Sequence, residues 1–334
     1  MKVYVRSINE LKQMHSITTW IQIPSHSGKI ALFVLNLFLS LRPVSAHQEL
    51  ILDTTTIEAQ RSMVQVLSGA LPISNDVYLK SRSSAKERKL AAEYLYAQLA
   101  NAGLNPERHE YKVSNKLAVL DLFFDPYIGT NVYTIVPSTT GSKEYVVLGA
   151  HYDSEPGSPG ANDNATGVSL AYELAVKIKQ LKHRERNFII VFFDQEEDGL
   201  IGSRAFAKKL KKEGACIHSV HTTDMVGWDG DGDSAVELEL PTDAIEALYK
   251  QAAKSLNIPL YRTSVNSSDH AAFRELGFQA VGISEEYAGG DTTPHYHQAT
   301  DTADTVNFPF LAQATQLVWE VMKTLASQHE AQNL

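Results

Sequence analysis

The sequence predicts an α/β fold, a three-layer α/β/α sandwich around a largely parallel, mixed central sheet. Three observations lead to this prediction. Short apolar runs typical of buried strands alternate with stretches of helical period along most of the chain. No internal repeat or low-complexity linker interrupts residues 47–334, so we expect them to form one domain. Polar residues follow directly after several apolar runs, where parallel strands present functional side chains.

The expected elements can be placed along the chain in order. Two helices come first, over residues 54–70 and 84–102, and the second has an apolar stripe and stops before Gly103. The remaining expected elements are strands at residues 107–113, 131–137 and 144–150, a helix over 165–181, a strand at 188–193, a helix over 203–213, a strand at 219–224 and a closing helix over 309–327.

The composition is that of an ordinary globular protein. Hydrophobic residues make up 43% of the 334 residues and charged residues 21%, which excludes disordered and collagen-like chains. A formal charge of −9 argues against broad nucleic-acid binding, because no basic face is available to displace phosphate counterions. The single cysteine, Cys216, excludes an intrachain disulfide, and we expect its side chain to be buried.

Residues 1–46 have the pattern of a signal peptide. Lys29 precedes an apolar run at residues 30–41, and small residues at positions 44–46 suit signal peptidase. The run is short for a membrane span, so we expect cleavage and a secreted or periplasmic product, without a stable membrane partner. An uncleaved anchor through residues 30–41 is the alternative. The stretch before Lys29 is long for an n-region, so we expect translation to start downstream of Met1.

Side chains that can bind metal ions follow three of the expected strands, where each strand ends. They are His151, Asp153, Glu196, Glu197 and Asp224. Each pattern alone has an ordinary explanation, since an adjacent pair of glutamates usually lies in a solvated loop. The carboxyl ends of parallel strands meet at one edge of the sheet, however, so we expect these side chains to come together.

Two loops add further ligand types to this edge. Asp163 lies in the segment G-A-N-D-N-A-T-G, where it or Asn164 could instead cap the following helix. His295 and His297 lie in P-H-Y-H-Q-A-T-D-T, which could be a solvated connection. Carboxylates gathered this closely repel each other, and two divalent cations would remove that repulsion. Imidazole and carboxylate ligands without thiolate favour Zn²⁺, so we expect two zinc ions per chain in a catalytic site.

These segments resemble the zinc-dependent peptidases of family M28, which include secreted bacterial aminopeptidases. The matching segments occur in the family's order over residues 53–330: H-Y-D, G-A-N-D-N-A-T-G, E-E-D-G-L-I-G-S, D-M-V-G, S-D-H-A-A-F and H-Q-A-T-D-T. The resemblance implies a fold of the zinc-exopeptidase type. It also implies a di-zinc peptidase that acts on a peptide with a free N-terminus and releases the N-terminal residue.

The resemblance assigns metal ligands residue by residue. It implies that Asp163 bridges both zinc ions. The other four ligands divide between the ions, His151 and Asp224 on one, Glu197 and His297 on the other. The spacing between His297 and Asp301 matches the family and favours His297 over its competitor, His295, two residues earlier.

Further roles also follow from the resemblance. It implies that Glu196 is the general base and that Asp153 orients His151. It also implies a cis Asp163–Asn164 peptide bond. Asp269 and His270 are expected at the rim of the substrate pocket, although a capped helix start would explain them equally. No tyrosine stands shortly before them where some relatives carry one, so the group that polarises the substrate carbonyl is unassigned.

Other activities on this scaffold stay open. A carboxypeptidase or an amino-acid amidohydrolase would share the site. A glutaminyl cyclase shares the fold but cyclises N-terminal glutamine with one zinc, and its relatives usually carry Asp-Ser where this chain has Asp163-Asn164. A non-catalytic ectodomain would have no need of Glu196.

Overall fold

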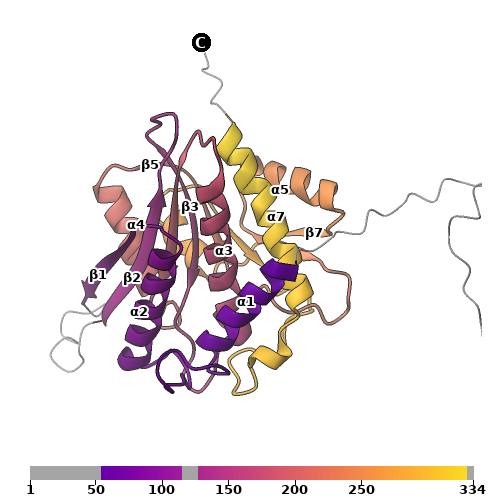
Figure 1. Ribbon diagram of the computed structural model, residues 1–334. Coiled ribbons are helices and arrows are strands. Elements are labelled where there is room, and N and C mark those ends of the chain that lie inside the picture. The colour runs from indigo at the N-terminus through magenta and orange to yellow at the C-terminus, as the bar shows by residue number, and fades with distance from the viewer. Residues whose placement is uncertain (1–53, 115–126, 329–334) are drawn as a thin grey trace, which may run out of the picture. The chain divides into compact units, whose positions relative to one another are not determined.

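The computed structural model describes residues 54–114 and 127–328 (Figure 1). The helices are α1 (Thr54–Leu67), α2 (Ala85–Asn101), α3 (Gly167–Gln180), α4 (Ile201–Lys212), α5 (Asp243–Leu256), α6 (Asp269–Arg274) and α7 (Phe308–Ser327). The strands are β1 (Pro106–Val113), β2 (Tyr127–Val136), β3 (Glu144–His151), β4 (Asn187–Phe193), β5 (Cys216–Thr223), β6 (Val236–Glu239), β7 (Leu260–Thr263) and β8 (Ala280–Ser284).

The strands form one mixed sheet of eight strands in the order β1-β2-β4-β3-β5-β8-β6-β7. Its centre is parallel, because β3 pairs in parallel with both β4 and β5, and β5 pairs in parallel with β8. Antiparallel pairs join β1 to β2, β2 to β4, and β6 to β8. The predicted mixed sheet with a parallel centre is confirmed.

Helices cover both faces of this sheet. The alternation along β4 shows why: Phe188, Ile190 and Phe192 belong to one hydrophobic core, and Ile189 and Val191 to the other. The first core also contains apolar side chains of α1, α2, α3, α5 and α7, and the second contains those of α4 and α6. A strand that is apolar on both sides must be buried on both faces. The three-layer α/β/α sandwich is therefore confirmed.

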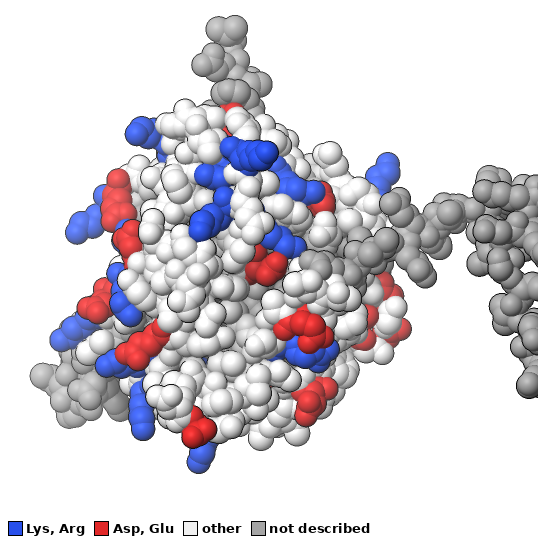
Figure 2. Space-filling view, viewed as in Figure 1, with Lys and Arg blue, Asp and Glu red and all other residues white. Residues whose placement is uncertain are grey.

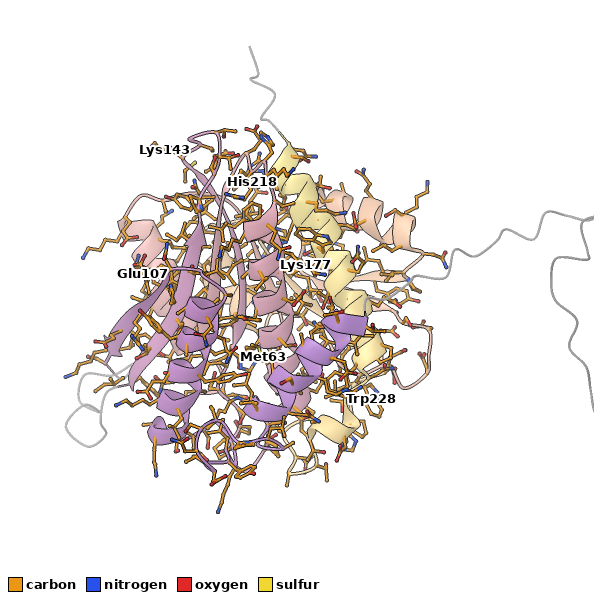
Figure 3. The ribbon with its side chains drawn as sticks, viewed as in Figure 1. Met63, Glu107, Lys143, Lys177, His218 and Trp228 are labelled. Atoms are coloured by element: carbon orange, nitrogen blue, oxygen red, sulfur yellow. The ribbon has the colours of Figure 1, made fainter. Side chains whose placement is uncertain are left out.

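Charged side chains lie on the outer surface of the helical layer, and apolar side chains lie on its inner surface. Figure 2 shows Lys and Arg side chains interspersed with Asp and Glu side chains on the face viewed in Figure 1. On the inner side, Met63 of α1 is buried with the first core (Figure 3). In the described part of the chain, no helix combines the length and apolar character that a membrane span requires. The predicted signal peptide lies outside the described residues and stays a prediction.

The expectation that Cys216 is buried is wrong. Its side chain is exposed because it opens β5, and this strand becomes fully buried only from Ser219 onward. The strand therefore begins three residues before the polar Ser219 that marked its predicted start. A small apolar residue at a strand's first position need not reach the core.

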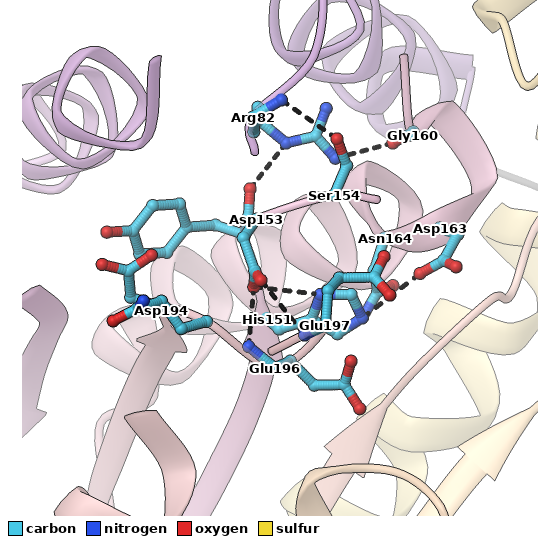
Figure 4. A network of polar contacts seen from close by, with 12 residues as sticks. Arg82, His151, Asp153, Ser154, Gly160, Asp163, Asn164, Asp194, Glu196 and Glu197 are labelled. Carbon is cyan, nitrogen blue, oxygen red and sulfur yellow. Dashed lines mark hydrogen bonds and ion pairs between the residues drawn. The ribbon is translucent and has the colours of Figure 1, made fainter. Parts of the chain in front are cut away.

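A buried arginine joins α1 to the chain segment that follows β3. Arg82 is 0% exposed, and its guanidinium donates hydrogen bonds to four backbone carbonyl groups. The accepting oxygens belong to Leu67 (2.8 Å), Tyr152 (2.6 Å), Pro159 (2.6 Å) and Gly160 (2.8 Å). Figure 4 shows the guanidinium reaching Gly160 and the backbone beside Asp153. Arg82 thereby fixes the loop between His151 and Asp163.

We predict that Arg82→Met lowers the free energy of unfolding by about 3 kcal/mol or more, because several buried carbonyl groups lose their donors. Arg82→Lys should lie between this variant and the wild type, since lysine keeps the charge but lacks the planar fork. Urea denaturation monitored by circular dichroism measures both.

Arg262→Met provides the control, because Arg262, with 47% of its side chain exposed, forms its ion pairs with Asp243 and Glu246 at the surface. Its loss should change the unfolding free energy little. Equal effects at Arg82 and Arg262 would contradict the structural role given to Arg82.

Candidate metal centre

The site lies at the carboxyl ends of the three adjacent central strands, β4, β3 and β5. His151 is the last residue of β3, Glu196 and Glu197 follow β4, and Asp224 follows β5. Because these strands are parallel, their ends meet at one edge of the sheet. The structure therefore brings the three predicted strand-end groups together.

One cluster of candidate ligands surrounds His151. Its Nε2 atom lies 3.3 Å from Asp163 Oδ1 and 3.3 Å from Asp224 Oδ1. The three ligand atoms all lie within 4.8 Å of one another. His151 is 0% exposed and Asp163 is 5% exposed, so burial would leave their charges poorly solvated without a cation.

A second cluster shares Asp163 with the first. The other oxygen of this carboxylate, Oδ2, lies 3.2 Å from His297 Nε2, which in turn lies 3.2 Å from Glu197 Oε2. Glu155 also places an oxygen within 4.8 Å of ligand atoms of Glu197 and His297. Glu155 was missed in the sequence, although it comes two residues after Asp153 beyond the end of β3.

The spacing of these atoms fits zinc. Zinc–nitrogen and zinc–oxygen bonds of about 2.0–2.2 Å in a tetrahedral site separate neighbouring ligand atoms by about 3.3–3.6 Å. The observed separations of 3.2–3.3 Å are close to this value. Glu197 Oε1 is buried and has no hydrogen-bond partner among the described residues, as expected of an oxygen that can bind a metal ion. In both clusters, the distances from the histidine to the carboxylates therefore fit the ion that the resemblance implies.

The segment around Asp163 is held from both sides. The predicted cis peptide bond joins Asp163 to Asn164. On one side, the Asp301 carboxylate accepts the backbone N–H groups of Asn162 (2.8 Å) and Asp163 (3.1 Å). On the other, the Asn164 amide donates to the Thr223 carbonyl at 2.8 Å. The loop of the histidines and the end of β5 thus both position Asp163.

Asp153 orders the turn that carries the two glutamates. Its Oδ1 accepts the backbone N–H of Glu196 at 3.0 Å, and its Oδ2 accepts that of Glu197 at 3.1 Å. Its Oδ1 also lies 3.4 Å from His151 Nδ1. Figure 4 shows dashed lines from the Asp153 carboxylate to His151 and to the two glutamates. Asp153 therefore lies beside His151, which it is predicted to orient, and it also fixes the glutamate backbone, which the sequence did not reveal.

Three residues in or next to the candidate ligands have a left-handed backbone conformation. Gln195 precedes the glutamates with φ 59°, Met225 follows Asp224 with φ 51°, and His297 itself has φ 57°. Residues other than glycine are disfavoured in this left-handed region. Where they adopt it, the surrounding structure holds them in place, and they occur more often at functional sites.

The pKa values of two glutamates and one histidine in the centre are raised. Burial raises the pKa of Glu197 to about 7, and burial also raises the pKa of Glu196 well above its ordinary value. Hydrogen bonds to Asp163 and Glu197 raise the pKa of His297 to about 10. The raised pKa values mean that the two glutamates bind protons more tightly than usual, and a bound cation would favour their ionised forms.

A cavity of about 250 Å³ opens beside the two clusters. Glu196 lines it next to Glu197, and Tyr296, whose ring stacks on that of His297 at 3.7 Å, lines it as well. The structure places His297 toward the carboxylates, whereas His295 Nδ1 lies 2.9 Å from the Thr300 hydroxyl.

The predicted pocket residues Asp269 and His270 lie behind the cavity wall. Both are buried, at 1% and 0% exposed, and the cavity is lined instead by their neighbours Ser267 and Ser268. Ser268 precedes α6, but its side chain makes no capping hydrogen bond.

Comparison with known proteins agrees with this geometry. The family model described as "Peptidase family M28" matches residues 131–322. A probable leucine aminopeptidase of Arthroderma otae is 30% identical over 213 residues, which cover 58% of this chain and 57% of that relative. The chain thus aligns with little more than half of that relative's length.

Two solved structures share the fold. A zinc aminopeptidase from Bacillus subtilis superposes with a TM-score of 0.71 at 17% identity, covering 82% of this chain and 96% of that one. A glutaminyl cyclase of Bacteroides thetaiotaomicron superposes with a TM-score of 0.67 at 19% identity, covering 82% and 98%. The fold is therefore common to both activities. The family match covers more than half of the sequence, and the chain belongs to peptidase family M28.

Proposed function

We propose that this protein is a zinc aminopeptidase that releases the first residue of peptides with a free N-terminus. The observation that supports this most directly is the Asp163 carboxylate, whose two oxygens face two separate clusters of histidine and carboxylate ligands. A cavity lined by Glu196 opens beside both clusters. The names of the similar proteins, a probable leucine aminopeptidase and a zinc aminopeptidase, agree with this activity.

Two zinc ions per chain would be held by five side chains. Asp163 would be shared, His151 and Asp224 would complete one site, and Glu197 and His297 the other. Zinc bound there would polarise the scissile carbonyl group and lower the pKa of water. The complete cluster around His151 favours the peptidase over a single-zinc glutaminyl cyclase.

Glu196 would act as the general base and then the general acid. It is buried and lines the cavity, and its backbone N–H is fixed by Asp153. Its carboxylate would take a proton from the attacking water and return that proton to the leaving amine. Adjacent side chains diverge, so Glu197 can approach His297 while Glu196 stays free for proton transfer.

The shape and charge of the cavity suit an N-terminal residue. Its volume accommodates one or two side chains rather than a folded segment, and its lining is rich in carboxylates. These negative charges would attract the ammonium group of a free N-terminus. We further propose that residues 1–46 direct export, for which N-terminal sequencing of secreted protein starting near His47 is the test.

We predict that Glu196→Gln lowers kcat by about 10²–10⁴-fold, because glutamine keeps the shape but cannot accept the proton. KM and zinc content should change little, since neither substrate nor metal binding depends on proton transfer. Glu197→Gln is the matched comparison at the neighbouring position. This variant should lose zinc, and with it thermal stability, because bound metal stabilises the folded state. Steady-state kinetics on aminoacyl-4-nitroanilides, combined with elemental analysis, measures both. A Glu196→Gln protein with near-wild-type kcat would rule out this role.

The two neighbouring histidines give a second prediction. His297→Ala should lose zinc, because His297 faces both Asp163 and Glu197. His295→Ala should keep its zinc, because His295 bonds to Thr300. Elemental analysis of both purified variants decides the assignment, and the reverse pattern would show that the ligand is His295.

A further inference from the structure

One fully buried carboxylate takes no part in the proposed reaction. Glu285 directly follows β8, and its side chain is 0% exposed. It does not line the cavity, and it belongs to neither cluster of candidate ligands. Burying a carboxylate costs free energy unless hydrogen-bond donors surround it. The donors around Glu285 therefore indicate what this carboxylate holds in place.

Three donors from three different segments reach the Glu285 carboxylate. The Asn162 side-chain amide donates to Oε2 at 2.9 Å, and the backbone N–H of Trp228 donates to the same oxygen at 2.9 Å. The backbone N–H of Thr293 donates to Oε1 at 3.2 Å. These contacts join Glu285 to positions 123, 57 and 8 residues away in the sequence.

The donors belong to the segments that carry three of the five candidate ligands. Asn162 directly precedes Asp163, the ligand that both clusters share. Of the two backbone donors, one lies four residues after Asp224 and the other lies four residues before His297. The Glu285 carboxylate therefore ties these three segments to one another.

Asp153 holds the other two ligands in a comparable way. Its carboxylate accepts the backbone N–H of Glu197 at 3.1 Å and lies 3.4 Å from His151 Nδ1. Each cluster combines a ligand held by Asp153 with ligands on the segments that Glu285 joins. Neither group of ligands can therefore complete a zinc site alone, and the affinity for zinc depends on how the two groups are aligned.

The segments that Glu285 joins also pack directly against one another. A Cβ atom at Gly227 would lie 2.8 Å from Asn162 Oδ1, so a larger residue would push the two segments apart. The Trp228 ring donates from Nε1 to Asp291 Oδ1 at 3.2 Å, which links the loop after β5 to the loop after β8. A change at the Glu285 carboxylate would therefore affect all three segments.

We propose that Glu285 is a positioning residue of the metal centre, whose carboxylate fixes three ligand-bearing segments relative to one another and thereby sets the affinity for zinc. This inference rests on the proposed two-zinc function. Replacing a residue that orients metal ligands typically weakens metal binding by about 10- to 100-fold.

Glu285→Gln tests the proposal, because glutamine keeps the size of the side chain but has only one acceptor oxygen. That oxygen can keep the two donors at the Oε2 position, and the amide nitrogen then faces the N–H of Thr293. Two donors that face each other repel, so the segment before His297 is released. We expect the dissociation constant of the zinc held by Glu197 and His297 to rise by about 10- to 100-fold, measured by competition with a chromophoric chelator.

Glu237→Gln is the matched control. Glu237 is also 0% exposed, and its carboxylate also accepts two backbone N–H groups, those of Ala288 and Gly289. These donors lie at the exposed tip of the loop after β8, and neither adjoins a candidate ligand. This variant should keep the zinc affinity of the wild type.

A second measurement separates positioning from a general loss of stability. A positioning residue acts through metal occupancy, so zinc buffered above the raised dissociation constant should restore the kcat of Glu285→Gln on leucyl-4-nitroanilide. A lower free energy of unfolding combined with wild-type zinc affinity would show that Glu285 has a structural role only, and it would contradict the proposal. Equal losses of zinc affinity in Glu285→Gln and Glu237→Gln would contradict it as well.

Glu285→Asp covers the case in which Glu285→Gln does not fold. Aspartate keeps the charge but is one methylene group shorter, so it cannot reach all three donors and should also weaken zinc binding. Wild-type zinc affinity in this variant would overturn the proposal.

The wild type separates this inference from the proposed function. If the wild type binds two zinc ions and hydrolyses leucyl-4-nitroanilide, but the Glu285 variants keep its zinc affinity, only the inference fails. If the wild type binds fewer than two zinc ions, the two-zinc function fails, and the inference fails with it.

Discussion

Electrostatic repulsion among carboxylates at the ends of three parallel strands is the constraint on which this site depends. The sheet places Glu197 and Asp224 on either side of His151, and the loop after β3 adds Asp163 between them. Such a concentration of buried negative charge is unstable without cations. The Asp163 carboxylate, with one oxygen toward each histidine, is the point where the two clusters meet.

The groups around the ligands serve to hold this arrangement. Asp301 and Asn164 fix the backbone on both sides of Asp163, and Asp153 fixes the turn of the glutamates. Arg82 ties down the intervening loop through backbone carbonyl groups and places a positive charge near the carboxylates. Supporting contacts of this kind orient the ligands, and metal affinity depends on them as well. The strained conformations of Gln195 and Met225 are tolerated in the same framework.

The fold and the main candidate ligands could be predicted because both depend on local patterns. The apolar run of β4 requires burial on two faces, and parallel strands bring His151, Glu197 and Asp224 to one edge. Arg82 could not be predicted, because its role comes from packing between segments distant in the sequence. The expectation for Cys216 failed because residue type alone does not reveal how far along a strand burial begins.

The central claim is that the two clusters form a pair of zinc sites that share Asp163. Crystals of the protein purified with zinc, measured on both sides of the zinc absorption edge, test it most directly. The anomalous difference map should show two peaks, one among His151, Asp163 and Asp224, and one among Asp163, Glu197 and His297. A single peak in fully active protein, or a peak away from Asp163, would contradict the shared site.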